Sequence, residues 1–189
     1  IAKAKEGVRV RIILDGQVPA DQKDKGSKII PYLEAAGIPV IRWRGVGASA
    51  RYHGQHRKIM IVDSKAAIAG GLNFGDDYSH RGSGSKKWRD TDVLMEGPSV
   101  LESESLFTRV WNEQAPRSGE APLPEPSLIA EAQGMARIAV IDHVPGKNEN
   151  GLLSALLAID AAHQSIDIEN AYFILDPAVL RALRRAKDR

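Results

Sequence analysis

Short apolar runs alternate with longer amphipathic stretches along most of the chain. Short runs rich in β-branched residues predict strands, and apolar positions that recur every three or four residues predict helices. The predicted strands cover residues 8–14, 38–43, 58–62, 66–69, 91–96, 137–141 and 165–169. The predicted helices cover residues 27–36, 99–112 and 152–162, with a last one that starts at Pro177. Strands that alternate with helices indicate an α/β sandwich in which a mixed sheet is flanked by helices.

Three of the predicted helices have start signals in the sequence. Ser27 has the residue type of an N-cap. Ser99 and Glu102 have the spacing of a capping box, in which each side chain bonds the other residue's backbone N–H. Asp176 is a predicted N-cap that is followed by Pro177 at the first helical position. The predicted buried face of the 99–112 helix consists of Leu106, Phe107, Val110 and Trp111.

Residues 115–126 interrupt this pattern. They contain four of the chain's ten prolines, and proline removes a backbone donor and fixes φ. We therefore expect an exposed linker without regular structure that separates the two parts of the chain.

Charge is unevenly distributed, although the net charge is only +2. Residues 1–60 carry 12 Lys and Arg against 5 Asp and Glu, whereas residues 61–189 carry 14 against 19. The stretch 41–58 has basic residues and no acid, which is typical of an anion-binding surface or of a solvated face. The absence of cysteine excludes a disulfide scaffold, a zinc–thiolate site and a thiol nucleophile.

The sharpest chemical signal is a set of polar residues at the ends of two predicted strands. His56 and Lys58 are two residues apart, so on a strand their side chains share a face. A tight turn at residues 63–65 returns the chain on a neighbouring strand. That strand carries Asn73 back towards the end where His56 and Lys58 emerge.

An imidazole, an ammonium and a carboxamide at one place suit an anionic tetrahedral centre. Lys58 supplies charge, Asn73 supplies neutral N–H donors, and His56 can attack phosphorus or move a proton. Gly70 and Gly71 would let such a ligand approach the backbone closely. Because these groups can stabilise developing negative charge, no metal or other cofactor is expected.

Two other interpretations of these residues remain open. A histidine–lysine pair at a strand end is often surface decoration, although a shuffled chain of this composition would contain H-x-K-x-x-x-x-D about 0.02 times. His53 and His56 also have the spacing of a metal-binding pair, but the sequence offers no obvious third ligand.

One stretch resembles the HKD signature of the phospholipase D superfamily: HRKIMIVD at 56–63, followed by GGLN at 70–73. Two later stretches resemble those that follow the signature in its cardiolipin synthase-like branch, WRDT at 88–91 and EGP at 96–98. A third, NAYF at 170–173, resembles the opening of that branch's second half. The resemblance extends over nearly the whole chain.

The resemblance implies a phosphodiesterase or phosphatidyltransferase that acts on phospholipids through a phosphohistidine. His56 would be the nucleophile or the acid/base partner of the first half. Lys58, Gly71 and Asn73 would bind the substrate's phosphoryl oxygens. Asp63 would be structural and would hold the turn that follows its strand.

A carboxylate should orient the histidine through its other ring nitrogen, as in catalytic triads. Asp90 is the first candidate for this role and Asp92 is the second. Either residue could instead form a salt bridge with Arg89 or Lys87.

The family uses two HKD blocks that face each other, whereas this sequence contains one. The resemblance therefore implies a fragment. Residues 1–114 would be the C-terminal part of a first half, residues 115–130 the proline-rich join, and residues 131–189 the truncated start of a second half. The second block would come from a part of the protein outside this chain or from a homodimer partner.

The implied substrate is a phospholipid, and the implied acceptor is water or an alcohol such as glycerol or phosphatidylglycerol. Peripheral membrane association follows, at a bacterial cytoplasmic membrane or after export.

Two rival functions stay open. The first is a nuclease of the same chemistry, in which residues 41–58 track a nucleic-acid backbone. The second is a catalytically incomplete half that only binds lipid or a partner.

Overall fold

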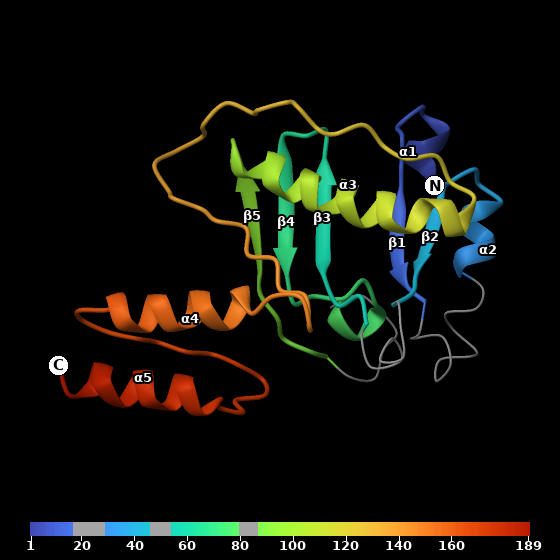
Figure 1. Ribbon diagram of the computed structural model, residues 1–189. Coiled ribbons are helices and arrows are strands. Elements are labelled where there is room, and N and C mark those ends of the chain that lie inside the picture. The colour runs from blue at the N-terminus through green and yellow to red at the C-terminus, as the bar shows by residue number, and fades with distance from the viewer. Residues whose placement is uncertain (17–28, 46–53, 80–86) are drawn as a thin grey trace. The chain divides into compact units, whose positions relative to one another are not determined.

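The computed structural model describes residues 1–16, 29–45, 54–79 and 87–189. The chain divides into two compact units, Ile1–Ile138 and Ala139–Arg189 (Figure 1). The predicted N-cap Ser27 and residues 46–53 of the basic stretch 41–58 lie outside the described residues.

The first unit contains both strands and helices, as the hydrophobic pattern predicts. Its described elements are α1 (Ala2–Lys5), β1 (Ile12–Asp15), α2 (Ile29–Glu34), β2 (Val40–Trp43), β3 (Lys58–Val62), β4 (Ala66–Gly70), the 3-10 turn η3 (Asp76–Tyr78), β5 (Asp92–Glu96) and α3 (Ser99–Ser118). The α/β class with helices beside the strands is confirmed. Among the described residues the strands form two sheets: β1 and β2 pair in parallel, and β3, β4 and β5 form an antiparallel sheet in that order.

A tight turn joins β3 to β4 and sets their register. Asp63 and Ser64 both have positive φ, 54° and 55°, as the central residues of a type I′ turn do. Lys65 N–H donates to Val62 C=O at 3.0 Å. Such turns match the twist of paired strands. Lys65 follows the turn, and the paired strands begin with Val62 opposite Ala66.

Helix α3 packs against strands of both sheets (Figure 1). One core cluster consists of Ile41, Trp111 and Ala115, with Ile13, Phe107 and Leu123 packed against it. The second consists of Ala67, Met95 and Val100, with Ile61 and Ala69 beside it. The predicted buried face of the helix is confirmed, since Leu106, Val110 and Trp111 are buried and Phe107 stacks on Trp111 at 5.9 Å.

The start of α3 differs from the prediction. Its N-cap is Pro98, and no side chain caps it. Gly97, at φ 94°, turns the chain so that the helix begins one residue earlier than the capping box requires. Ser99 is therefore already helical, and its carbonyl accepts a hydrogen bond from the Ser103 hydroxyl. The capping-box prediction is wrong.

The end of α3 also differs, because the helix continues through Pro116 to Ser118. Residues 115–118 are thus helical instead of the start of a linker. Ala115 is fully buried against Ile41 and Trp111, and this packing outweighs the proline's lost hydrogen bond in the last turn. Gly119 ends the helix in the left-handed conformation, at φ 71°.

The chain that follows α3 is held against the helix. Trp111 Nε1–H donates to the Ala121 carbonyl at 3.0 Å. The Asn112 amide both donates to the Leu123 carbonyl at 2.9 Å and accepts from the Leu123 N–H at 2.7 Å. The expected linker therefore begins as a strap, residues 119–123, which these hydrogen bonds hold against α3 although most of its residues are exposed.

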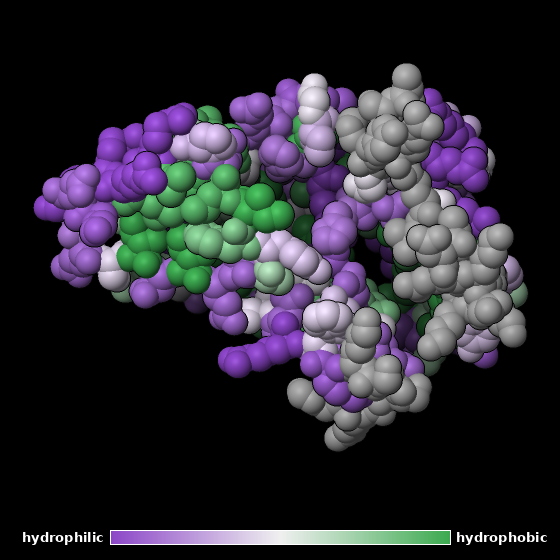
Figure 2. Space-filling view, turned by 90° about the horizontal axis from the view of Figure 1, so that it is seen from below, coloured by the Kyte–Doolittle hydropathy of each residue, from purple (hydrophilic) through white to green (hydrophobic). Residues whose placement is uncertain are grey.

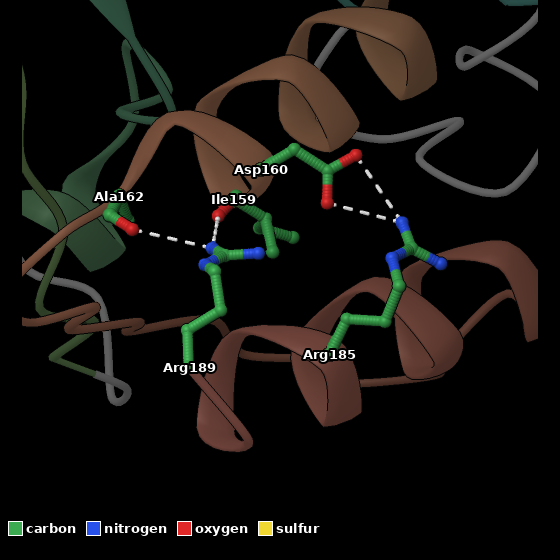
Figure 3. A network of polar contacts seen from close by, with 5 residues as sticks. All are labelled: Ile159, Asp160, Ala162, Arg185 and Arg189. Carbon is green, nitrogen blue, oxygen red and sulfur yellow. Dashed lines mark hydrogen bonds and ion pairs between the residues drawn. The ribbon is translucent and has the colours of Figure 1, made fainter.

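The second unit contains two helices, α4 (Asn150–Ala161) and α5 (Pro177–Lys187). Asp176 caps α5 by accepting the Ala178 N–H at 2.7 Å, with Pro177 at the first position, which confirms that prediction. Arg185 forms a two-oxygen ion pair with Asp160, at 3.0 and 3.2 Å (Figure 3). Arg189 donates to the carbonyls of Ile159 and Ala162 at the end of α4 (Figure 3).

The predicted strands at residues 137–141 and 165–169 are absent from the described residues. A strand forms only where a partner pairs its backbone groups, and no strand is present in this unit. Large apolar side chains consequently stay exposed in this unit, among them Leu153, Leu157, Ile168 and Ile174. Figure 2 shows apolar surface gathered over this unit.

Candidate active site

At one end of the antiparallel sheet, three of the candidate site residues lie opposite one another on neighbouring strands. Lys58 lies opposite Gly70, and Gly70 lies opposite Asp92. Side chains alternate between the faces of a strand. Ile61, Ala67 and Met95 pack in the cluster beside α3, so Lys58 lies on the other face of the sheet.

His56 lies just outside β3, because the strand begins at Lys58. Its side chain is exposed. Lys58 Nζ donates to the His56 backbone carbonyl at 2.8 Å, so the lysine ammonium lies beside the histidine's peptide. The structure thus brings the two residues together through a backbone contact instead of through a shared strand face.

Asp90 lies against Gly71. A Cβ at position 71 would be 2.6 and 2.7 Å from the two Asp90 carboxylate oxygens. Asp90 Oδ1 also accepts the Thr91 N–H at 2.8 Å. Burial lowers the pKa of Lys58, and the negative charge of Asp90 opposes that shift.

Asp92 lies against Gly70 and has a different contact. Asp92 Oδ1 accepts the Leu72 N–H at 3.1 Å, and a Cβ at Gly70 would lie 2.0 Å from the same oxygen. Asp92 therefore fixes the chain as it leaves β4. Of the two candidates for orienting the histidine, Asp90 is the one whose charge acts on Lys58.

The two glycines lie directly beside acidic side chains. We predicted that Gly70 and Gly71 leave room for a ligand against the backbone. In the structure the space that a Cβ would take at each position is occupied by the carboxylate of Asp92 at Gly70 and of Asp90 at Gly71. The glycines thus set where the acids lie.

Asn73 follows β4 and is held by Tyr78. Asn73 Nδ2 donates to the Tyr78 hydroxyl at 2.8 Å. Tyr78 lies in η3, and the neighbouring Asp77 carbonyl accepts the Trp88 N–H at 2.8 Å. This contact ties the Asn73 segment to the strand-entry segment that carries Asp90.

Asp63 lies at the opposite end of the hairpin. Four residue steps of about 3.3 Å separate Lys58 from Val62, and Asp63 follows Val62 in the turn. It is therefore about 13 Å or more along the strand from Lys58. A role in the turn fits this place, and contact with the same phosphoryl group does not.

The arrangement suits an anionic oxygen-rich group. Lys58 and Asn73 offer donors, His56 is exposed, and the charge of Asp90 acts on Lys58. His53, needed for the metal-pair alternative, lies outside the described residues. In the part of the chain that is described, no three His, Asp or Glu side chains gather as a metal would need.

One acid that the sequence did not mark lies next to the histidine segment. Asp15, the last residue of β1, accepts the Gln55 N–H at 2.9 Å through Oδ2. Its place at the carboxyl end of a parallel strand was the available signal, since ligands of open α/β sheets bind at that edge.

A lysine held against the peptide of an exposed histidine, with an acid whose charge acts on that lysine, is an arrangement that suits binding of a phosphoryl group. Residues 1–111 match the family model described as "Cardiolipin synthase, PLD-like domain". The chain belongs to this family, as the sequence resemblance predicted.

Similar proteins extend the match over nearly the whole chain. The cardiolipin synthase of Alkalihalophilus pseudofirmus is 30% identical over 194 residues, which cover 98% of this chain and 37% of that protein. That of Halalkalibacterium halodurans is 31% identical over 199 residues, covering 97% and 37%. That of Clostridium perfringens strain SM101 is 31% identical over 199 residues, covering 97% and 40%.

The chain thus spans well under half the length of these relatives. Among the described residues, no helix is both long and apolar enough to cross a membrane.

Proposed function

We propose that the protein is a phosphatidyltransferase that works on phospholipids through a phosphohistidine at His56. The observation that carries this proposal is the cluster at one end of the β3–β4–β5 sheet. There Lys58 Nζ donates to the His56 backbone carbonyl, and the negative charge of Asp90 acts on Lys58. The names of the relatives, all cardiolipin synthases, support the substrate class.

The first step forms a bond between a ring nitrogen of His56 and phosphorus. The bond from phosphorus to the leaving alcohol breaks, and that alcohol takes a proton from an acid. Lys58 and Asn73 stabilise the negative charge that develops on the phosphoryl oxygens. The negative charge of Asp90 favours the protonated form of Lys58.

The second step reverses these roles. The hydroxyl of an acceptor attacks phosphorus, the phosphorus–nitrogen bond breaks, and the acceptor's proton goes to the group that served as the acid. With phosphatidylglycerol as both donor and acceptor, the products are cardiolipin and glycerol. With water as the acceptor, the product is phosphatidic acid.

We propose that a second HKD block supplies the acid that protonates the leaving alcohol. The sequence contains one H-x-K-x-x-x-x-D block, and one imidazole cannot be both the nucleophile and the acid in the same step. The second block belongs to a further part of the protein or to a second copy of it.

The test uses the full-length protein and vesicles that contain phosphatidylglycerol labelled in its phosphate. We expect labelled cardiolipin, and after a rapid acid-free quench we expect label on His56 by mass spectrometry. His56→Ala should abolish both products. His163→Ala, which removes an exposed histidine of the second unit, is the matched control and should keep the activity.

Three results separate the alternatives. Phosphatidic acid as the main product would replace transfer by hydrolysis. Cleavage of an oligonucleotide with a steep salt dependence, without lipid turnover, would support the nuclease. Phosphodiester turnover that survives His56→Ala would refute the phosphohistidine mechanism.

A further inference from the structure

The segment that carries His56 is anchored to the parallel sheet. Asp15 Oδ2 accepts the Gln55 N–H at 2.9 Å. A Cβ at Gly54 would lie 2.6 Å from the same oxygen, so the carboxylate is seated directly against the backbone at residues 54 and 55. Only glycine at position 54 leaves the space that this contact needs.

Gln55 also holds Arg57, the residue that follows His56. The Gln55 side-chain oxygen accepts the Arg57 N–H at 3.3 Å and Arg57 Nη1 at 3.0 Å. Gln55 therefore binds Asp15 through its backbone and Arg57 through its side chain. The residues before and after His56 are both held, while the imidazole stays exposed.

Asp15 can serve as an anchor because its own backbone is fixed. It ends β1, where it pairs with Trp43 of β2. Gly16 N–H donates to the Trp43 carbonyl at 2.8 Å. Two residues earlier Ile13 packs on the core cluster of Ile41 and Trp111.

We propose that Asp15 is a positioning residue for the reaction: it holds the Gln55 amide and so fixes the backbone from which His56 reaches phosphorus. This inference rests on the proposed function of His56. The physical reason is that nucleophilic attack needs a defined distance and direction, and a displacement of about 1 Å can cost roughly 100-fold in rate.

The first test compares Asp15→Ala with Asp15→Asn in the full-length protein. Alanine removes the acceptor, and asparagine keeps an oxygen that can accept the Gln55 N–H. We expect Asp15→Ala to slow phosphohistidine formation about 10- to 100-fold in a single turnover, with KM changed less than about twofold. Asp15→Asn should recover most of this rate.

Hydrogen exchange adds a readout that does not depend on activity. The Gln55 amide should lose protection in Asp15→Ala and keep it in Asp15→Asn. Glu34→Ala is the matched control, because Glu34 also pairs with the parallel sheet, through Arg42 at 3.7 Å, but is half exposed. It should leave the rate and the Gln55 protection unchanged.

The second test displaces the carboxylate without removing it. Gly54→Ala places a methyl group 2.6 Å from Asp15 Oδ2, so it should slow phosphohistidine formation as Asp15→Ala does. Because both changes break one contact, the double variant should be no slower than Asp15→Ala alone. This test still holds if Asp15→Ala folds poorly.

The outcomes distinguish this inference from the proposed function. Normal phosphohistidine formation in Asp15→Ala, or fully additive losses with Gly54→Ala, would overturn the positioning role alone. A loss that Asp15→Asn does not reduce, accompanied by an equal loss of thermal stability, would also overturn it. A wild-type protein that never labels His56 would overturn the proposed function and the positioning role together.

Discussion

We expect Gly71→Ala to displace the Asp90 carboxylate without destabilising the fold. The new methyl group would lie 2.6 Å from one Asp90 oxygen, whereas ordinary van der Waals contact begins at 3.4 Å. The carboxylate must therefore move by about 0.8 Å. It is the free end of an exposed side chain, so the movement costs the fold little.

The chemistry should suffer more than the fold. Asp90 acts electrostatically on Lys58, and a displacement close to 1 Å in such a cluster can lower the rate by up to about 100-fold. We expect Gly71→Ala to lower kcat/KM for phosphatidyl transfer roughly 10- to 100-fold. Its urea midpoint should stay close to that of the wild type.

Gly70→Ala is the matched comparison, one residue earlier. A Cβ there would lie 2.6 Å from the Thr91 carbonyl oxygen and 2.7 Å from the Asp92 Cα. These are backbone atoms at the start of β5, the strand paired with β4, and overpacking of this kind costs about 1–3 kcal/mol. We expect Gly70→Ala to lower the free energy of unfolding by that amount.

The assay pairs vesicle kinetics with urea unfolding of both variants in the full-length protein. A Gly71→Ala protein with the wild-type rate would show that the position of Asp90 does not matter to the reaction. Equal destabilisation by the two substitutions would show that the position 71 contact is also part of the backbone packing.

Three further predictions follow from single contacts. Tyr78→Phe removes the hydroxyl that accepts from Asn73. It should lower kcat/KM about threefold to tenfold, the effect of one net hydrogen bond, with unchanged thermal stability; an unchanged kcat/KM would exclude this role. Asp90→Asn removes the charge that opposes the lowering of the Lys58 pKa. If protonated Lys58 binds the phosphoryl oxygens, the alkaline limb of the pH–rate profile should move to lower pH, and a shift to higher pH would contradict the assignment. Trp111→Ala empties the centre of the first core cluster, where the side chain is 1% exposed, and should cost about 3–5 kcal/mol in urea unfolding; a cost below about 1 kcal/mol would contradict the packing.

The strands around the site were predictable because each has a strong local pattern. Residues 58–62 are predicted and observed with the same bounds, since one apolar run ends at a tight turn. The turn residues Asp63 and Ser64 then fix the partner strand. Family membership was predictable for a related reason: the HKD spacing is local in sequence.

The contacts that shape the site were not predictable from local pattern. Asp15 is 40 residues from Gln55, and nothing in either segment indicates that they meet. The crowding of Gly71 by Asp90 likewise depends on how β4 meets the segment before β5. Non-local packing also explains the errors at the ends of α3 and in the second unit, where burial of Ala115 and absent strand partners outweigh propensity.

The strap after α3 has a consequence for anyone who divides the protein for separate study. Proline content alone suggests a cut at Ala115, but such a truncation removes the Ala121 carbonyl that accepts from Trp111 and the Leu123 backbone that pairs with Asn112. It would also strip Leu123 from the cluster around Ile41. A piece that ends beyond Leu123 keeps those partners, so limited proteolysis should stop at the far side of the strap and spare residues 115–123.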